Sequence, residues 1–453
     1  MGRISLQQAA LWCGGSVQEK YKEVTFLGAN NDSRKIQPGQ LFLALQGARD
    51  GHDFIPAALA NGAAAVLCTH CDGDYPAIVV PDVRLALGEI AKQERLHLGM
   101  KVVGITGSVG KSTTKEMVAA VLEGTYRVAK TPANHNNDIG MPMAILSMPE
   151  DTQVAVVEMG MNHFREIAYL TEIARPDLAV VVNIGTMHIE FLGSREGILK
   201  AKMEIQEGMP ESGTLYLNGD DALLWHCRGT TIVHPEYFGV ENDQCQVQAL
   251  DVQEQPGGVS LRVKTPQGEF PLHLPVEGLH YVHDALAAVS VGLGMDVPLD
   301  KIREGLENFR NMEGRQEILE VKGFTIIKDC YNAGPESMAA ALRVLHNRPG
   351  RHVAVLGDML ELGFASAAEH YKVGRIAAEQ ADLLFAYGPS SSRVLGGAIT
   401  GGMPLSRAKA FEDRSKLVKA LKQMTRPGDV LLFKGSRGMR MELALEEFLK
   451  TEE

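Results

Sequence analysis

The stretch GITGSVGKSTT, from Gly104 to Thr114, carries the residue types that bind the phosphates of a nucleotide. Glycines let the backbone approach a phosphate, a lysine supplies positive charge for the β- and γ-phosphates, and a hydroxyl can bind Mg²⁺. The spacing departs from the common phosphate-binding loop, because Ile105 stands where that loop has its first glycine. The candidate phosphate-binding residues are Gly107, Ser108, Val109, Gly110, Lys111, Ser112 and Thr113.

The sequence on either side of this loop favours phosphate binding over the alternative, a tight strand-to-helix turn with a surface lysine. The apolar run KVVGIT predicts a buried strand before the loop, and KSTTKEMVAAVLEG predicts a helix after it that ends at Gly124. The free N–H groups and the dipole at the start of such a helix attract an anion. Glu158 ends a second apolar run and is a candidate to hold Mg²⁺ with Ser112; the alternative is a carboxylate that caps a helix.

The bulk composition is that of a globular protein with two to four domains in its 453 residues. The formal net charge of −11 argues against nucleic acid or an anionic membrane as the main partner. We expect no signal peptide and no membrane insertion, because no apolar run reaches the ~18 residues that a span needs. Six cysteines are too few for a disulfide scaffold, so a cytoplasmic protein with reduced thiols is expected. We also expect a monomer. The pair Cys68 and Cys71 has no second pair to complete a zinc site and is interpreted as the end of a strand.

Three blocks of alternating strand and helix patterns predict an α/β protein with domains at residues 1–98, 99–313 and 314–453. In the first block, AAAVLC and AIVV predict strands, and VRLALGEIAKQERLHL predicts a helix. In the second, VAVVEMG and LAVVVNIG are continuous apolar runs, typical of strands that are buried on both faces of a parallel sheet. The gaps near Leu98 and Met312 are the expected hinges.

The remaining patterns predict a side hairpin and a second open sheet. LRVKTPQGEFPLHL has alternating strands around a Pro-Gln-Gly turn, which predicts a smaller side sheet, and residues 276–294 predict a helix. In the third block, FTIIKDC, HVAVLGDM, DLLFAYG and DVLLFKGS predict buried strands of a Rossmann-like sheet. The stretch GGAITGGMP is predicted to be a loop.

The loop spacing T-G-x-x-G-K-[ST] resembles that of the Mur ligases and of the related folylpolyglutamate synthetases, which join a carboxylate to an amine at the expense of ATP. TPANHNNDIGMP, EMGMN, VVNIGTMH and GRQE are similar to further motifs of the Mur ligase family. More selective are DSRKIQPGQLFLALQGARDGHDF, DCYNAGPESM, VLGDMLELG and KGSRGMRME. The resemblance extends from about Asn31 to Leu445 and implies the family's three-domain fold, with a small N-terminal α/β domain, a central P-loop ATPase domain and a C-terminal Rossmann-like domain.

The resemblance implies that ATP phosphorylates a peptide carboxylate and that an amine then displaces the phosphate. The selective motifs resemble those of the branch that joins D-alanyl-D-alanine to UDP-N-acetylmuramoyl-tripeptide in peptidoglycan synthesis. The family resemblance also implies two Mg²⁺ ions and a carbamate, derived from CO₂, on Lys202. Lys200 is the alternative lysine, but the A-K-x-x-[IL] spacing selects Lys202, although Gln206 stands where the family has an aromatic residue. The implied catalytic residues are Lys111, Glu158, His188 and Lys202, and the implied metal ligands are Ser112, Glu158, His188 and Lys202.

The nucleotide contacts that the resemblance implies include two departures from the family pattern. The family's G-x-H-N-x-x-N-A reads GLHYVHDA here, so Tyr281 and Asp284 replace the asparagines that hold adenine. An ionised aspartate can only accept hydrogen bonds, and we hypothesise that Asp284 accepts from the adenine amine while Tyr281 or a backbone group donates. The further implied nucleotide residues are His280, Arg315 and Asp329.

The implied substrate contacts lie in all three blocks. Gly334 replaces the second asparagine of the family's YNANP, and Lys328 stands where a second acid is frequent, so one side-chain contact is lost. The UDP-sugar contacts are expected at Ser33, Arg34, Gly47, Asp50, Gly51 and His52, although Asp50-Gly51 would also form a tight turn. Phosphate or substrate contacts are expected at Asn134, Asn136, Lys434 and Ser436, and the dipeptide contacts at Asn332, Ser337 and Asp358.

Three alternatives remain open from the sequence. A sister ligase that adds a single amino acid would be expected to carry a different third-domain motif. A folylpolyglutamate synthetase lacks a long block before its P-loop, whereas about a hundred residues precede the loop here. An ATP-binding scaffold without catalysis is disfavoured by the retention of Lys111, Glu158, His188 and Lys202.

Overall fold

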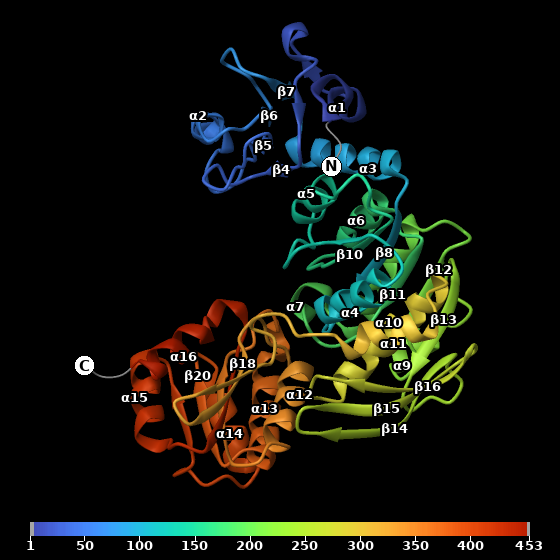
Figure 1. Ribbon diagram of the computed structural model, residues 1–453. Helices are drawn as coiled ribbons and strands as arrows, with labels where there is room; N and C mark the ends of the chain where they lie inside the picture. The colour runs from blue at the N-terminus through green and yellow to red at the C-terminus, as the bar shows by residue number, and fades with distance from the viewer. Residues whose placement is uncertain (1–3, 451–453) are drawn as a thin grey trace.

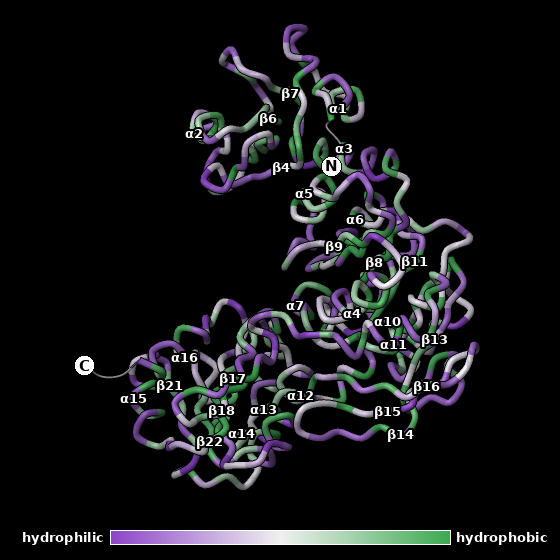
Figure 2. The backbone as a smooth tube through the Cα atoms, in the orientation of Figure 1, coloured by the Kyte–Doolittle hydropathy of each residue, from purple (hydrophilic) through white to green (hydrophobic). Residues whose placement is uncertain are grey.

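The computed structural model describes residues 4–450, which form three α/β units along the chain. We call residues 4–98 the first unit, 99–313 the central unit and 314–450 the third unit. Figure 1 shows the first unit at the top, the central unit below it and the third unit at the lower left. In Figure 2 the strands inside the sheets are mainly hydrophobic and the outer loops hydrophilic, as expected for sheets covered by helices.

The first unit contains a five-stranded sheet in the order β2-β7-β6-β5-β4, with β4 to β7 parallel and β2 antiparallel at the edge. Its strands are β2 (Ser16–Val17), β4 (Ala29–Asn30), β5 (Leu41–Leu43), β6 (Ala65–Cys68) and β7 (Ala77–Val79), and β1 (Ile4–Ser5) pairs with β3 (Thr25–Phe26). Its helices are α1 (Leu6–Cys13), α2 (Ile55–Ala60) and α3 (Val83–Leu98). The predicted strands at β6 and β7 and the predicted helix at α3 are confirmed.

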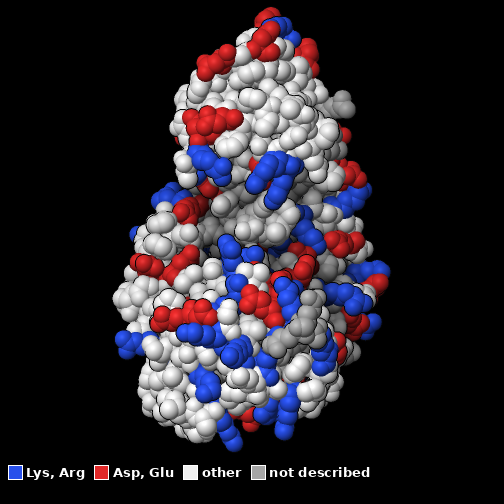
Figure 3. Space-filling model, turned by 90° about the vertical axis from the view of Figure 1, so that its left-hand side faces the viewer, with Lys and Arg blue, Asp and Glu red and all other residues white. Residues whose placement is uncertain are grey.

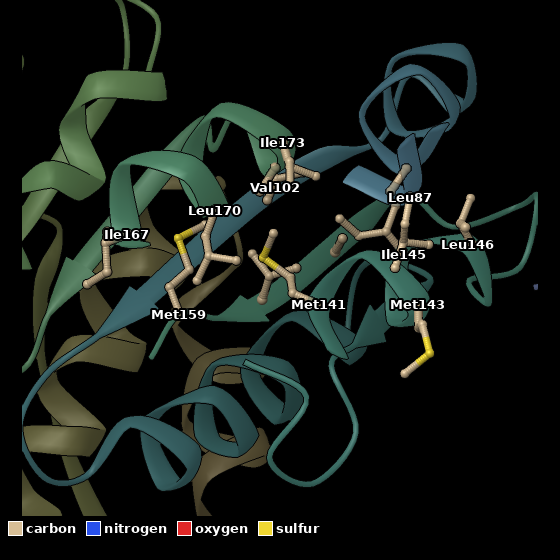
Figure 4. Packing of buried hydrophobic residues seen from close by; sticks show 14 of the residues in the cluster. Leu87, Val102, Met141, Met143, Ile145, Leu146, Met159, Ile167, Leu170 and Ile173 are labelled. Atoms are coloured by element: carbon tan, nitrogen blue, oxygen red, sulfur yellow. The ribbon is translucent and has the colours of Figure 1, made fainter. Parts of the chain in front are cut away.

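Helix α3 packs on the central unit as well as on the first. Asp82 caps its start through its carboxylate, and Gly99 ends it in the left-handed conformation. Leu87 and Ile90 belong to one hydrophobic cluster with residues of α5 (Gly140–Leu146) and α6 (Glu166–Ala174), and Figure 4 shows Leu87 beside Ile145. Arg95 adds polar contacts, donating to the carbonyl oxygen of Ala174 at 2.9 Å and pairing with Asp177 at 3.1 Å. The first and central units therefore share a continuous core.

The central unit contains a nine-stranded sheet in the order β16-β15-β14-β13-β12-β11-β8-β10-β9. Its strands are β8 (Lys101–Thr106), β9 (Val128–Lys130), β10 (Val154–Glu158), β11 (Leu178–Val181), β12 (Thr214–Asn218), β13 (His234–Gly239), β14 (Val247–Gln255), β15 (Gly258–Thr265) and β16 (Gly268–Leu274). The strands from β9 to β14 pair in parallel, and the predicted hairpin β15–β16 is antiparallel. The expectation of a separate side sheet is wrong, because β14 pairs with both β13 and β15 and joins the hairpin to the main sheet.

Both faces of this sheet are covered, which explains the continuous apolar runs in its strands. Val103 and Ile105 of β8 pack with α4 (Lys111–Glu123), α10 (His280–Gly294) and α11 (Leu299–Glu307). Val102, on the opposite face, packs in the cluster of α5 and α6. The remaining α-helices of this unit are α7 (Ile189–Leu192), α8 (Arg195–Met203) and α9 (Ala222–His226).

The third unit contains a six-stranded sheet in the order β17-β18-β22-β19-β20-β21, parallel except for β17. Its strands are β17 (Glu317–Val321), β18 (Phe324–Asp329), β19 (Arg351–Gly357), β20 (Leu383–Tyr387), β21 (Ala408–Phe411) and β22 (Asp429–Lys434). Its helices are α12 (Pro335–His346), α13 (Ser366–Gln380), α14 (Ser391–Thr400), α15 (Arg414–Met424) and α16 (Met441–Leu449). The first three pack on one face of the sheet and the last two on the other, as a Rossmann-like layout predicts.

The predicted loop GGAITGGMP is wrong over its first half, because α14 continues to Thr400. Its glycines allow two helices to approach closely rather than marking a turn. A Cβ atom at Gly397 would lie 1.9 Å from the carbonyl oxygen of Tyr371 on α13. The chain leaves the helix at Gly401 and Gly402.

None of the helices in residues 4–450 is long and apolar enough to cross a membrane.

Candidate active site

The phosphate-binding loop lies between β8 and α4, and the segment that follows β11 is hydrogen-bonded to its middle. Gly110 has a left-handed φ of +85° and α4 begins at the next residue, with Thr113 in its first turn. The side-chain oxygen of Asn183 accepts from the backbone N–H groups of Ser108 and Val109 at 3.1 and 3.0 Å. Asn183, at the carboxyl end of a buried strand, was not among the sequence candidates, although that position is where ligands bind open α/β sheets.

Two lysines converge on one carbonyl group of the loop. Lys111 Nζ donates to the Gly107 carbonyl oxygen at 2.8 Å, and Lys202 Nζ donates to the same oxygen at 2.9 Å. Lys202, on α8, is 1% exposed, and its pKa is well below its usual range because of burial and then the charge of Lys111. Burial also lowers the pKa of Lys111. Lys200 is not part of this group, since its ammonium lies over the ring of Phe164.

Glu158, at the end of β10, turns both carboxylate oxygens toward hydrogen-bond donors near the loop. Ser112 Oγ donates to Oε2 at 2.7 Å, and Asn136 Nδ2 donates to Oε1 at 2.8 Å. Residues 4–450 contain no group of three acidic, histidine or cysteine side chains that could hold a metal. Mg²⁺ does not require one, because it is commonly bound through one or two carboxylates together with substrate phosphates. Ser112 and Glu158 therefore fit a Mg²⁺ site, while Asn134 is exposed and contributes only a backbone bond to Asn136 at 2.8 Å.

The third unit contributes an arginine to the loop. Arg315 Nη2 donates to Ser112 Oγ at 2.9 Å, and its guanidinium lies 4.1 Å from the ring centre of Tyr331. Asp329 pairs with Lys434 at 2.6 Å, and Lys434 also donates to the carbonyl oxygen of Asn332 at 3.1 Å. The structure thus gathers these residues at the carboxyl ends of β18 and β22, as the sequence predicted for ligands of an open sheet.

His188 faces the third unit through one ring nitrogen. Its Nδ1 lies 2.7 Å from Glu361 Oε2, and this contact lowers the pKa of Glu361. Both residues have a left-handed backbone, with φ of +65° and +63°. Glu361 was not among the sequence candidates, although it lies in the motif VLGDMLELG; its contact with a distant loop could not be seen in the sequence.

Asp284, near the start of α10, is not the simple ionised hydrogen-bond acceptor that was expected from the sequence. Thr114 Oγ1 donates to Asp284 Oδ1 at 2.7 Å, and burial raises the pKa of Asp284 to about 7. Near neutral pH the carboxyl is therefore partly protonated and able to donate as well as accept. The Tyr281 hydroxyl accepts from Asn311 at 2.9 Å, and burial lowers the pKa of the adjacent His280 to about 4.

The other candidate residues of the third unit make hydrogen bonds that stabilise local structure. Ser337 Oγ bonds both backbone groups of Gly334 at the start of α12, and Asp358 accepts from the backbone N–H of Ser390 at 2.9 Å. Ser436 Oγ accepts from the backbone N–H of Leu360 at 2.9 Å. A Cβ atom at Gly334 would lie 2.7 Å from the Met187 side chain, so the asparagine of the family pattern would require that side chain to move.

The candidate UDP-sugar residues lie in the first unit, whose β5 and α2 are away from α4 in Figure 1. Arg34 pairs with Asp32 at 2.9 Å, which lowers the pKa of Asp32 to about 2, and Ser33 beside them is buried. Asp50 bonds the backbone and the ring of His52, in the short loop that begins at Gly47 and passes through Gly51. Figure 3 shows Lys and Arg side chains bordering a hollow between the top of the molecule and the rest, although the whole chain is acidic.

Comparison with known protein families finds similarity in each of the three units. A model of the Mur ligase family catalytic domain matches residues 23–95, one of the Mur ligase middle domain matches 105–292, and one of the Mur ligase glutamate ligase domain matches 314–437. The UDP-N-acetylmuramoyl-tripeptide–D-alanyl-D-alanine ligase of Bacillus subtilis is 37% identical over 97% of this chain and 96% of its own.

Solved structures show the same similarity in three dimensions. A crystal structure of MurF from Acinetobacter baumannii matches with a TM-score of 0.92 and 32% identity, covering 100% of both chains. The MurF ligase of Thermotoga maritima, in complex with ADP, matches with a TM-score of 0.82 and 30% identity over 93% of this chain and 97% of its own.

Proposed function

The chain belongs to the Mur ligase family, and from this premise we propose that it joins D-alanyl-D-alanine to UDP-N-acetylmuramoyl-tripeptide, with conversion of ATP to ADP and phosphate. The observation that carries the proposal is the full-length similarity to ligases named for this reaction. It includes the third unit, where the incoming amine is expected to be selected. We expect the reaction to take place in the cytoplasm, where ATP is available.

The positive groups around the P-loop support phosphoryl transfer to the peptide carboxylate. A carboxylate and a triphosphate repel each other, so the transition state requires fixed cations nearby. Lys111 lies in the loop, and Arg315 reaches its Ser112 from the third unit. Mg²⁺, held by Ser112 and Glu158, would neutralise charge on the transferring phosphoryl group. The product of this step is an acyl phosphate of the peptide.

Lys202 supports a carbamate beside the P-loop. A lysine attacks CO₂ through its neutral amine, and the lowered pKa of Lys202 increases the neutral fraction. The neutral amine gives up one proton as the N–C bond forms and the carbamate anion is left; counted from the lysine ammonium, two protons are released. Repulsion between Lys202 and Lys111 would become attraction, and the new anion together with His188 would favour a second Mg²⁺.

Contacts between the central and third units support closure over the reacting groups. His188 meets Glu361, and Ser112 meets Arg315, so docking of the third unit completes the surroundings of the P-loop. Closure would exclude the water that hydrolyses an acyl phosphate. Residues Ser33, Arg34 and the loop Gly47–His52 would hold the UDP-sugar at the far end of the substrate.

The test is phosphate release from ATP in the presence of different substrate pairs. We expect release only when UDP-N-acetylmuramoyl-tripeptide and D-alanyl-D-alanine are both present. Release with a free amino acid in place of the dipeptide would identify a sister ligase. No release with the full pair would identify an ATP-binding scaffold. Assays with tripeptides that end in diaminopimelate or in lysine would show which residue the enzyme accepts at the third position of the peptide.

A further inference from the structure

Glu336, in the first turn of α12, connects the third unit to the segment that follows β11. Its Oε1 accepts from the backbone N–H of Thr186 at 2.9 Å and from the Thr186 hydroxyl at 3.0 Å. The approach is close, since a Cβ atom at Gly185 would lie 2.9 Å from the Glu336 carboxylate. Glu336 therefore lies against the central unit and not in solvent.

This segment is in direct contact with the P-loop. The backbone N–H of Gly185 donates to Ser108 Oγ at 2.9 Å, and the backbone N–H of Ser108 donates to the carbonyl oxygen of Asn183 at 3.1 Å. Glu336 touches Gly185 and Thr186, so a single backbone segment separates it from the loop that would hold the γ-phosphate. The amine that attacks an acyl phosphate must arrive at this junction between the central and third units.

The second carboxylate oxygen of Glu336 is buried and has no hydrogen-bond partner among residues 4–450. No lysine, arginine or histidine nitrogen in these residues lies within ion-pair distance of the carboxylate. A buried acceptor without a partner requires an explanation, such as a ligand or a catalytic role. Glu254, Glu369 and Glu442 also carry such an oxygen, but they face Asn347, Lys372 and Arg437 instead of the P-loop segment. Glu336 differs from these three glutamates because it lies against the segment that contacts the P-loop.

We propose that the free Oε2 of Glu336 binds the ammonium group of the incoming dipeptide and accepts a proton from it. The proposal rests on the proposed function. An ammonium group has no lone pair with which to attack, so it must lose a proton first. Transfer to Glu336 leaves R–NH₂ and a neutral carboxylic acid. The nitrogen lone pair then forms the C–N bond as the bond between the acyl carbon and the phosphate oxygen breaks. The departing phosphate keeps that electron pair and takes the second proton of the nitrogen.

The test compares two nucleophiles in the variant Glu336→Gln. The glutamine oxygen can still accept from Thr186, but the amide cannot take a proton. With D-alanyl-D-alanine we expect kcat to fall about 100-fold, the scale of general-base catalysis. With hydroxylamine, which is largely uncharged at neutral pH and needs no base, hydroxamate should form at the wild-type rate. The remaining dipeptide activity should rise with pH as free amine accumulates, and Glu336→Asp should restore part of the rate.

The matched control is Glu369→Gln. Glu369 is also in the first turn of a third-unit helix and also carries an oxygen without a hydrogen-bond partner. It faces Lys372 and not the P-loop segment, so this variant should leave both reactions unchanged. A dipeptide rate within twofold of wild type in Glu336→Gln would overturn the proposal. An equal loss of hydroxamate would also overturn it, because Glu336 would then act on phosphorylation or docking. Wild-type enzyme that forms neither amide nor hydroxamate would refute the proposed function itself.

Discussion

Arg315 Nη2 and Ser112 Oγ lie 2.9 Å apart and join the third unit to the first turn of the P-loop helix. The same hydroxyl donates to Glu158, so a single serine links a cation from one unit to a carboxylate of another. The guanidinium of Arg315 also stacks over the ring of Tyr331 in a cation–π contact. A nucleotide phosphate at this serine would therefore meet a guanidinium only while the third unit is docked.

The ring of Tyr331 should contribute to nucleotide binding through Arg315. A cation–π contact stabilises by about 1 kcal/mol, which corresponds to a change of roughly fivefold. We expect Tyr331→Leu to reduce kcat/KM for ATP by about this factor, whereas Tyr331→Phe should behave like wild type. Steady-state kinetics with varied ATP measure the effect. Equal losses in both variants would show that the hydroxyl, and not the ring, is important.

Replacement of Lys202 should abolish turnover, while replacement of Lys200 should not. Lys202 is buried at the P-loop and Lys200 packs on Phe164, so two lysines of one helix form a natural pair of variant and control. A short-chain carboxylate added to Lys202→Ala should restore part of the rate by replacing the carbamate. Phosphate release provides the measurement. Wild-type rates in Lys202→Ala would refute the assignment of this residue.

Asp284 should make the folded state less stable as the pH rises. Its pKa is about 7 in the folded protein and 3.8 as a free group, so the folded state binds the proton more tightly. The stabilisation is complete below pH 3.8 and is lost as the pH rises to about 7, because the unfolded state releases its proton first. At about 1.4 kcal/mol per pKa unit the loss is at most about 4 kcal/mol.

The variant Asp284→Asn isolates this effect, because its amide oxygen can accept from Thr114 but does not titrate. We expect its free energy of unfolding, relative to wild type, to increase from pH 5 to about pH 7 and then to level off. Urea unfolding at a series of pH values measures the difference. A constant difference across the series would show that Asp284 ionises normally.

Nucleotide selection provides a separate test of Asp284. If its ionised carboxylate accepts from the adenine amine, GTP should bind at least about tenfold more weakly than ATP above pH 7, because guanine presents an oxygen at that position. Asp284→Asn should keep this preference and Asp284→Ala should lose most of it. Calorimetric titration with the two nucleotides measures both. Equal affinity of the wild type for GTP would contradict the hypothesis.

The sequence predicted the repeating strands and helices and the P-loop, because each depends on residues that are close together in the chain. β8, the loop and α4 follow directly from an apolar run, glycines and a helical pattern. Asn183, Thr186, Glu336 and Glu361 lie inside motifs quoted from the sequence, but their roles could not be assigned there, since each acts through a partner in a distant segment. The same reason explains the errors at α14, where glycines serve a helix contact, and at β15–β16, where strand pairing extended a sheet.

The shared core around α3 has a consequence for movement of the first unit. Leu87 and Ile90 are buried against α5 and α6, and Arg95 is bonded to the end of α6, so α3 is anchored to the nucleotide-binding half. Rotation about Leu98 would expose these buried apolar side chains to water, which is unfavourable. The first unit is therefore expected to move together with α3 and the central unit rather than to pivot at Leu98. Separating the chain after residue 98 would expose on each fragment the apolar face that α3 shares with α5 and α6, and we expect both fragments to aggregate.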